Sequence, residues 1–323
     1  MTTLRNLMNL TRQPMSINIS PDELGLTGRE CPNESCEGYF KIEFGTGLKG
    51  ENLPCHCPYC GHKDQHDQFW TKAQIEYAKS VAMRKISDAI FKDLKTLEFN
   101  HKPKSSFGIG ISMKVKRDSP VPIHYYREDK LETEVICSSC TLRYSVYGVF
   151  AFCPDCGEHN SLQILEKNYQ IIEKMLDLAA ETSHAEIAER LIENALEDTV
   201  SAFDGFGREV CRIYSHKATN PNKILKISFQ NLELVKKRVI EEFSLDISSC
   251  ISNDEWGIIN RLFQKRHLIS HKMGVVDKEY IQKTGDINEI AGRKVKISTD
   301  DIKAILAITL KVGKYIISNI SEK

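Results

Sequence analysis

The chain of 323 residues lacks a net charge, because 44 lysines and arginines are balanced by 44 aspartates and glutamates. This balance excludes a protein whose whole surface binds polyanions, so any contact with nucleic acid must come from a local basic patch. Long apolar runs are missing as well. The first twenty residues contain no apolar segment of the signal-peptide kind, and no stretch elsewhere approaches the roughly 20 apolar residues of a membrane span. We therefore expect a cytoplasmic protein with no membrane partner.

Cysteine, in contrast, is abundant, with 11 in the chain. Eight of these residues form two spaced sets, which are Cys31-x4-Cys36 with Cys57-x2-Cys60, and Cys137-x2-Cys140 with Cys153-x2-Cys156. In a reducing compartment such paired motifs are typical of metal sites, because Zn²⁺ takes four thiolates in a tetrahedron and each turn supplies two. Gly61 and Gly157 provide the backbone freedom needed just after such a turn. Because four thiolates leave no place for water, we expect two structural zinc ions per chain, each in a zinc ribbon and neither catalytic.

Two alternatives to this zinc assignment exist. A Cys-x-x-Cys motif can be a redox pair, but this requires an isolated motif that opens a helix, and here the motifs are paired on β-like sequence. In the first set the x4 spacing leaves Cys55, His56 and His62 as substitute ligands.

The sequence between the two cysteine sets predicts one strand and one helix. Residues 107–115 alternate apolar with small or basic side chains, which predicts a half-buried strand with a basic outer face. With Lys102, Lys104 and Arg117 this is the densest basic stretch of the N-terminal half, and we favour a solvated face over a phosphate contact. Residues 69–99 have helical periodicity, and this helix should separate the two ribbons. Its apolar stripe contains Ile75, Ala78, Ala82, Ile86, Ile90 and Leu94.

From about residue 166 the cysteine pairs stop and amphipathic helices follow one another to the end. Ser252-x-x-Glu255 is a capping-box pattern and Gly274 a helix-ending glycine, so they frame one of these helices. The predicted fold is multidomain α+β, with small β zinc-ribbon modules followed by an all-α helical bundle. Its parts are an N-terminal extension (1–30), zinc ribbon 1 (31–66), a connecting helix (67–99), a β module with zinc ribbon 2 (100–165) and the helical domain (166–323).

The framed helix contains the segment QKRHLISHKMG at residues 264–274. Arg266 falls in its apolar stripe, where a guanidinium is costly to bury unless an anion or a carboxylate meets it. His267 and His271 are four residues apart, and His271 lies in the last turn, which favours the protonated form. Guanidinium suits phosphate, and imidazole suits proton transfer near neutral pH. The stripe itself consists of Ile258, Leu262, Ile269 and Met273.

At these residues the chain resembles a known family. Residues 266–271, RHLISH, are similar to the Arg-(polar)-x3-His motif of HEPN-superfamily domains, and the following GVVDKEYIQKTGDINEIAGRKVKIS resembles the tail that joins this motif to the final helix. The resemblance covers about residues 166–323 and leaves the zinc ribbons outside. It implies an α-helical domain that dimerises and often acts as a metal-independent ribonuclease in toxin, antiviral defence or RNA-processing systems. Arg266 and His271 would be its catalytic pair, and His267 would take the polar position.

The chemistry of RNA cleavage fits these residue types. RNA carries its own nucleophile, the 2′-hydroxyl, so cleavage needs a base or acid, such as His271, and a phosphate clamp, such as Arg266. On a continuous helix the two residues lie roughly 140° apart, so they converge only if the helix bends or a second copy of the chain contributes.

Two other functions stay open. The chain can be a non-catalytic adaptor whose ribbons bind nucleic acid or protein and whose helical domain only dimerises. Arg266 would then pair with an acidic residue of the long helix, such as Asp198, Asp204 or Glu209. A metal pair of His267 and His271 is disfavoured, because no third ligand is near in sequence.

Overall fold

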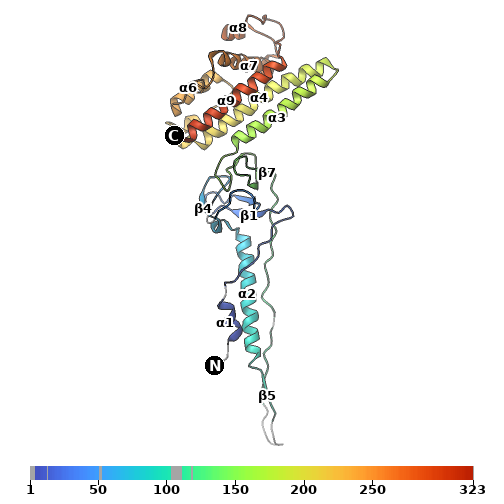
Figure 1. Cartoon of the computed structure of the whole chain (residues 1–323), viewed down its shortest axis with the longest axis vertical. Coiled ribbons are helices and arrows are strands. Elements are labelled where there is room, and N and C mark those ends of the chain that lie inside the picture. Colours follow the sequence, from blue (N-terminus) through green and yellow to red (C-terminus); the bar gives the residue numbers. More distant parts are fainter. Residues whose placement is uncertain (1–3, 13, 51–52, 103–110, 118, 323) are drawn as a thin grey trace. The chain divides into compact units, whose positions relative to one another are not determined.

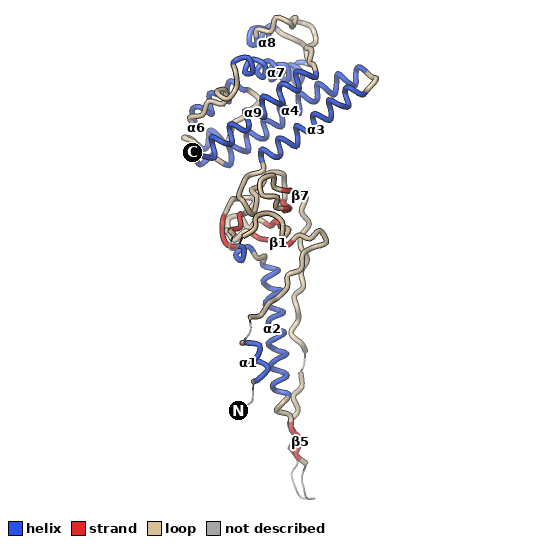
Figure 2. The backbone as a smooth tube through the Cα atoms, in the orientation of Figure 1, coloured by secondary structure: helices blue, strands red, loops and turns tan. Residues whose placement is uncertain are grey.

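The computed structural model describes residues 4–12, 14–50, 53–102, 111–117 and 119–322. The chain divides into two compact units, Met1–Glu158 and His159–Lys323 (Figure 1). Among the described residues the named strands lie in the first unit, and the second unit is built from helices (Figure 2). The predicted α+β layout, with small sheets first and helices after, is confirmed.

The first unit contains a four-stranded antiparallel sheet of order β1-β2-β8-β7. Its strands are β1 (Thr27–Glu30), β2 (Tyr39–Ile42), β7 (Thr133–Ile136) and β8 (Arg143–Val146). The central pairing joins β2 to β8, with Ile42 opposite Tyr144. The two cysteine sets, which the sequence assigns to ribbons separated by a helix, therefore share one sheet and one core. The physical reason is that a lone two-stranded hairpin is marginally stable in water, and pairing the two hairpins gives both a common buried face.

The two hairpins of this sheet are copies of one pattern. Thr27 and Thr133 each stand four residues before the first cysteine of their set. Thr27 pairs with Ile42 and Thr133 with Val146, so the register is the same in both. The residue four positions after the second cysteine of each hairpin is a fully buried aromatic ring, Phe40 in one and Tyr144 in the other. The strand order β1-β2-β8-β7 is therefore that of two like hairpins joined through their second strands.

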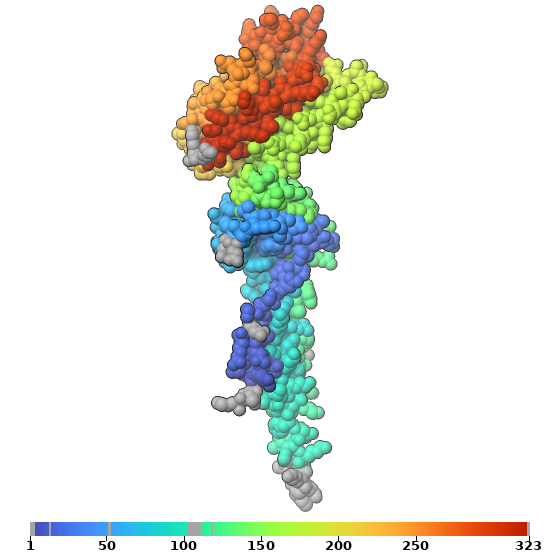
Figure 3. Space-filling model, in the orientation of Figure 1, coloured from blue at the N-terminus to red at the C-terminus, as the bar shows by residue number. Residues whose placement is uncertain are grey.

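The predicted helix between the cysteine sets is α2 (Lys72–Lys95), which begins with a capping box of Thr71 and Gln74. Its predicted apolar stripe is not buried. Ile75, Ile90 and Leu94 are exposed, and α2 forms an outer surface of the unit along its length (Figure 3). The buried positions of the helix are Gln74, Ser80, Ala89 and Asp93.

A polar contact explains the burial of Asp93 at the far end of α2. Its carboxylate accepts the backbone N–H groups of Asn6 and Leu7, each at 2.9 Å. These groups lie in the first turn of α1 (Arg5–Thr11), which has no capping side chain of its own. Although desolvation opposes it, these hydrogen bonds hold the pKa of Asp93 below its ordinary value. An aspartate of one helix thus caps another helix.

Two small hairpins complete the described part of this unit. β3 (Pro54–His56) pairs with β4 (Lys63–Gln65), and a 3₁₀ turn (His66–Phe69) follows. β5 (Phe99–His101) pairs with β6 (Ile111–Met113), and both strands are exposed throughout. The predicted half-burial of the basic strand is therefore wrong for residues 111–113, because no described element covers either face of this hairpin. Lys104, Phe107 and Ile109 lie outside the described residues.

The second unit is a helical bundle whose main core contains Phe203, Phe206, Phe229 and Phe263. A smaller buried cluster lies beside it and consists of Leu268, Val276, Tyr280 and Val295. The first helix of the unit begins at Ser161, earlier than predicted. Helix α7 has the predicted capping box at Ser252 and ends at Met273 and Gly274, which both have left-handed backbone. Its helices are α3 (Ser161–Glu181), α4 (Ala185–Ile213), α5 (Pro221–Ile224), α6 (Leu232–Phe243), α7 (Asn253–Lys272), α8 (Lys278–Thr284) and α9 (Thr299–Glu322), with a 3₁₀ turn at Ser215–Lys217.

Within the described ranges, α9 is the one helix that is long and apolar enough to cross a membrane. Its apolar side chains, among them Ile302, Ile305, Val312 and Ile316, are buried in the core of the bundle. A core helix of a folded domain passes the same test of length and composition. The described chain is therefore not a multispan membrane protein.

Helix α4 offers a matched pair of glycines that tests this packing. A Cβ at Gly207 would lie 2.5 Å from the ring of Phe229, whereas a Cβ at Gly205 meets nothing within 4 Å. We expect Gly207→Ala to destabilise the bundle by about 1–3 kcal/mol through overpacking. Gly205→Ala should stabilise it by up to about 1 kcal/mol, because alanine is the better helix former. Urea unfolding of the two variants measures the difference, and equal effects would contradict the described contact of Phe229 with α4.

Candidate metal centres and a basic cleft

Four tight turns present the eight cysteines of the two sets. The residue after the second cysteine of each turn has a positive φ, which is 44° at Glu37, 71° at Gly61, 65° at Thr141 and 72° at Gly157. In three of the turns its backbone N–H bonds back to the carbonyl of the first cysteine, at 2.9 to 3.0 Å. This reversal turns both thiols of a pair toward one centre. The sequence indicated Gly61 and Gly157, but nothing about glutamate or threonine predicts a left-handed backbone.

The thiols gather into two groups of four, Cys31, Cys36, Cys57 and Cys60, and Cys137, Cys140, Cys153 and Cys156. Within each group the sulfur atoms lie within 4.8 Å of one another. The shortest Sγ–Sγ distances are 3.7 Å in the first group and 3.4 Å in the second. A tetrahedral site with metal–sulfur bonds of about 2.3 Å has sulfur–sulfur edges of roughly 3.8 Å. Each group could therefore hold one metal ion with little rearrangement.

Protonation opposes metal binding at some of these thiols, although hydrogen bonds from neighbouring groups lower the pKa of Cys60 and of Cys137. Burial raises the pKa of Cys31 and of Cys156 to about 12, since a thiolate is poorly solvated there. A metal ion has to displace such protons when it binds, so metal affinity should fall as the pH falls.

The suggested substitute ligands do not belong to either group. Cys55 is buried beside the first group, and burial raises the pKa of its thiol to about 12. The ring of His56 lies against Gly157, where an added Cβ would be 3.1 Å from it. His62 lies 3.9 Å from a carboxylate oxygen of Asp64. The longer first turn therefore still brings Cys31 and Cys36 to one centre without help from these residues.

Reciprocal backbone hydrogen bonds join the two metal centres. The N–H of His56 donates to the carbonyl of Pro154 at 2.7 Å, and the N–H of Phe152 donates to that of Pro58 at 2.8 Å. In each hydrogen bond the donor is the residue just before one Cys-x2-Cys turn, and the acceptor is the carbonyl of the proline within the other turn. A change in the backbone of one thiol group should therefore alter the backbone of the other.

In the second unit, the buried cation of α7 is Lys265, and not Arg266 as the stripe predicted. Its ammonium donates to Glu289 at 3.0 Å and to the carbonyl of Lys296 at 2.7 Å. The buried apolar residues of α7 are Ile259, Leu262, Phe263 and Leu268, whereas Met273 is 89% exposed. The buried face of α7 is thus shifted by about one residue from the predicted stripe. The prediction missed this shift because α7 has apolar residues around much of its circumference.

Arg266 is half-buried and lies against a neutral group. Its Nη1 donates to Oε1 of Gln230 at 3.2 Å, and its buried Nε has no partner. The amide nitrogen of Gln230 donates in turn to Asp204 at 3.3 Å. Because arginine only donates and a carboxylate only accepts, these neighbours fix the orientation of the Gln230 amide. Among the described residues no carboxylate lies within ion-pair distance of Arg266, and Asp204 is reached only through Gln230.

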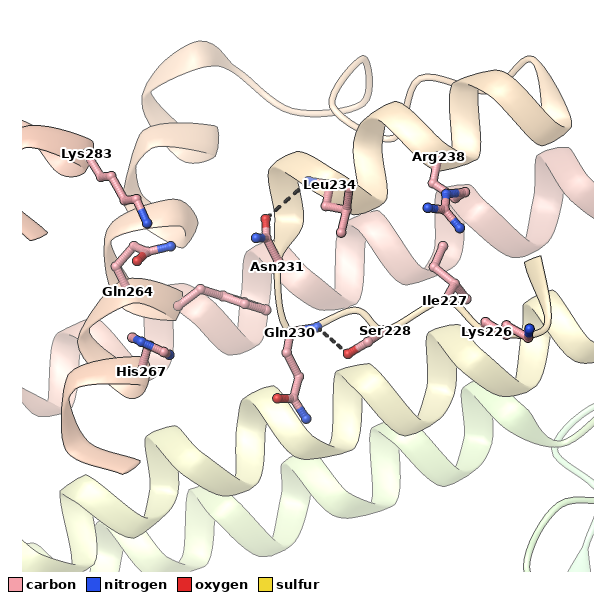
Figure 4. A pocket seen from close by; sticks show the side chains of 11 residues that line it. Lys226, Ile227, Ser228, Gln230, Asn231, Leu234, Arg238, Gln264, His267 and Lys283 are labelled. Carbon is pink, nitrogen blue, oxygen red and sulfur yellow. Dashed lines mark hydrogen bonds between the residues drawn. The ribbon is translucent and has the colours of Figure 1, made fainter. Parts of the chain in front are cut away.

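A cleft of about 320 Å³ opens where α7 meets the loop before α6 (Figure 4). His267 and Lys283 lie at one side of it, Lys226 and Arg238 at the other, and Gln230 between them. Its lining residues include no carboxylate, although the charges of the whole chain balance. The residues that line it are Lys226, Ile227, Ser228, Gln230, Asn231, Leu234, Arg238, Phe263, Gln264, His267 and Lys283.

The cleft also sets the protonation state of His267. Desolvation lowers the pKa of His267, and the charges of His271, Lys272 and Lys283 lower it further. This shift favours the neutral imidazole, which is the form that can accept a proton. The ring centroids of His267 and His271 are 4.8 Å apart.

Of the three predicted catalytic residues, the structure places only His267 in the wall of the cleft. Helix α7 is continuous from Asn253 to Lys272, so Arg266 and His271 keep their separation of roughly 140° around its axis. His267 lines the cleft, Arg266 adjoins it through Gln230, and His271 is exposed beside His267. Sequence reasoning missed Lys226, Gln230, Arg238 and Lys283, because they come from three other segments and match no motif.

Comparisons with protein-family models, with curated proteins and with solved structures found no match for this chain. Its function is therefore inferred from the two thiol groups and the cleft.

The left-handed turns give a test of the metal centres. Thr141→Gly should stabilise the metal-loaded protein by up to about 1 kcal/mol, because a β-branched residue is strained at positive φ. Gly157→Ala should destabilise it by about 1–2 kcal/mol, since the same backbone then carries a Cβ. Urea unfolding of metal-loaded protein measures both changes. A loss of stability in Thr141→Gly equal to that in Gly157→Ala would contradict the turn geometry.

Proposed function

We propose that the second unit is a HEPN-like ribonuclease that cleaves RNA without a catalytic metal ion, and that the first unit is a structural module with two zinc ions. One observation carries the ribonuclease proposal. A histidine whose pKa is lowered by desolvation, His267, opens into a cleft lined by cations and amides without a carboxylate, beside an arginine that no carboxylate of the described residues neutralises. This combination supports binding of a phosphodiester and removal of a proton beside it.

In the proposed reaction His267 removes the proton of the 2′-hydroxyl while O2′ attacks the phosphorus. The P–O5′ bond breaks, and a protonated His271 gives its proton to the leaving O5′. The products are a 2′,3′-cyclic phosphate and a 5′-hydroxyl. Arg266 stabilises the negative charge of the phosphorane-like transition state through its guanidinium charge.

The proton donor should come from a second copy of the chain. Within one protomer the rings of His267 and His271 are in contact at 4.8 Å, which leaves no room for a phosphate between them. A two-fold dimer would place His271 of one protomer opposite Arg266 and His267 of the other. Dimerisation through the helical unit is thus part of the proposal.

Zinc is the proposed metal because four thiolates in a tetrahedron match its preferred ligands. Both sets would be fully occupied by protein ligands, so the ions hold the fold and do no chemistry. Thiol groups of this kind persist in a reducing compartment such as the cytoplasm.

Mixed dimers test the shared site. Arg266→Ala and His271→Ala should each abolish cleavage of a labelled RNA pool, and a brief addition of EDTA should leave the wild-type activity unchanged. When the two inactive variants are mixed and allowed to exchange subunits, roughly a quarter of the wild-type activity should return, because half of the dimers are mixed and each has one intact site. Lys237→Ala, at an exposed position on α6, is the control that should keep full activity.

The outcomes separate the possible functions. No recovery on mixing, with both single variants inactive, would reject the shared site and leave catalysis within one protomer. If the wild-type protein cleaves no RNA, the non-catalytic adaptor becomes the better account of the chain.

Metal analysis tests the structural module. We expect two zinc ions per chain in the wild type and one in Cys140→Ser, because this change removes one thiolate from a closed site. Replacement of zinc by Co²⁺ should give the absorption bands of tetrahedral cobalt thiolate. A wild-type ratio near one would exclude one of the two centres.

A further inference from the structure

The cleft offers amide groups and apolar surface as well as positive charge. Its wall also includes the side-chain amides of Gln230, Asn231 and Gln264, and the apolar side chains of Ile227, Leu234 and Phe263. Cations, amides and apolar surface correspond to the three parts of a nucleotide, which are its phosphate, the edges of its base and the faces of its ring. We infer that the cleft is a subsite for one unpaired nucleotide of an RNA strand, next to the phosphate that is cleaved. This inference rests on the proposed function of α7.

The phosphate of this nucleotide would lie at the side of Lys226 and Arg238. The ammonium of Lys226 has no partner among the described residues, and Arg238 donates only one N–H, to the carbonyl of Lys223 at 3.3 Å. Helix α6 begins here too, because its N-cap Asn231 is a lining residue. The partial positive charge of a helix N-terminus adds to that of the two side chains. A phosphate here and a second one beside His267 would flank the nucleotide, whereas the ammonium of Lys283 already donates to Glu279 at 2.7 Å.

The base would lie between the amides and the apolar wall. Asn231 accepts the N–H of Leu234 with its Oδ1, at 3.1 Å, which leaves its Nδ2 as a free donor. The amide of Gln264 has no partner in the part of the chain that the structure describes, so it can both donate and accept. Leu234 is 53% exposed, and a base ring placed on it would remove apolar surface from water.

The size and the chemistry of the cleft favour a single strand over a duplex. Its volume of about 320 Å³ is at the lower end of small-molecule sites, which is the scale of one nucleotide. Base edges in an RNA duplex are paired or lie in grooves, whereas an unpaired base can enter a pocket and meet amides along its edge. The same chemistry would also take a free nucleotide, and the experiment must separate these two sources.

Binding of an uncleavable strand tests the subsite apart from catalysis. A fluorescent 2′-O-methyl RNA oligomer, which lacks the nucleophile, is titrated with the zinc-loaded full chain and followed by anisotropy. Lys226→Glu combined with Arg238→Glu should weaken binding at least about tenfold and flatten its salt dependence, because two phosphate contacts are lost. Lys237→Glu makes the same charge reversal as Arg238→Glu alone, on the same helix and next to Arg238 but outside the cleft, and should weaken binding less than about twofold. Gln264→Leu should weaken binding and leave the salt dependence unchanged, since it removes only a base contact.

Each outcome decides between the readings. Equal losses in the cleft variants and in Lys237→Glu, or equal affinity for the oligomer and its duplex, would overturn the subsite. If adenosine monophosphate competes at the concentration of the oligomer, the cleft binds a free nucleotide and the strand is rejected. The expected binding pattern without any cleavage of ordinary RNA would keep the subsite and reject the ribonuclease. Cleavage that depends on Arg266 and His271 but is unaffected by Lys226→Glu with Arg238→Glu would keep the ribonuclease and reject the subsite.

Discussion

The carboxylate of Asp204 holds together the part of the molecule on which the cleft depends. It is buried in α4 and accepts hydrogen bonds from the hydroxyl of Ser228, from the backbone N–H of Phe229 and from the amide of Gln230. The ring of Phe229 lies on Gly207, one turn further along the same helix. These contacts fix the loop between α5 and α6 to α4, and with it the wall of the cleft. They also occupy the carboxylate, so that Arg266 meets the amide of Gln230 instead.

A different constraint shapes the first unit, which has too little apolar surface for a large core. Its sheet has four short strands, and the buried residues of its core include five of the eight cysteines of the two groups, Cys31, Cys57, Cys137, Cys140 and Cys153, with the half-buried Cys36 and Cys156 packed against them. Small domains of this kind are commonly stabilised by metal ions. Pairing of β2 with β8 and the reciprocal hydrogen bonds between the turns join the two thiol groups within one core.

Sequence reasoning succeeded where the pattern is local. The cysteine spacing predicts both thiol groups, and Ser252 with Glu255 predicts the start of α7, because each depends on residues a few positions apart. It failed where burial depends on distant segments. The apolar stripe of α2 is exposed, because the residues that α2 buries include Asp93, whose partner is the first turn of α1, more than eighty residues away. The repeat of the two hairpins was present in the sequence but hidden, since the first turn has four residues between its cysteines and its counterpart has two.

The charges of residues 264–274 follow from their partners. Lys265 is neutralised by Glu289, and Lys272 by Asp277 and Glu279. Arg266, between them, is the cation of this segment that meets a neutral amide. Burying part of a guanidinium without a carboxylate costs free energy, and among the described residues one hydrogen bond, to Gln230, offsets part of that cost. An anionic ligand at Arg266 would offset this cost, which is the physical argument behind the proposed phosphate contact.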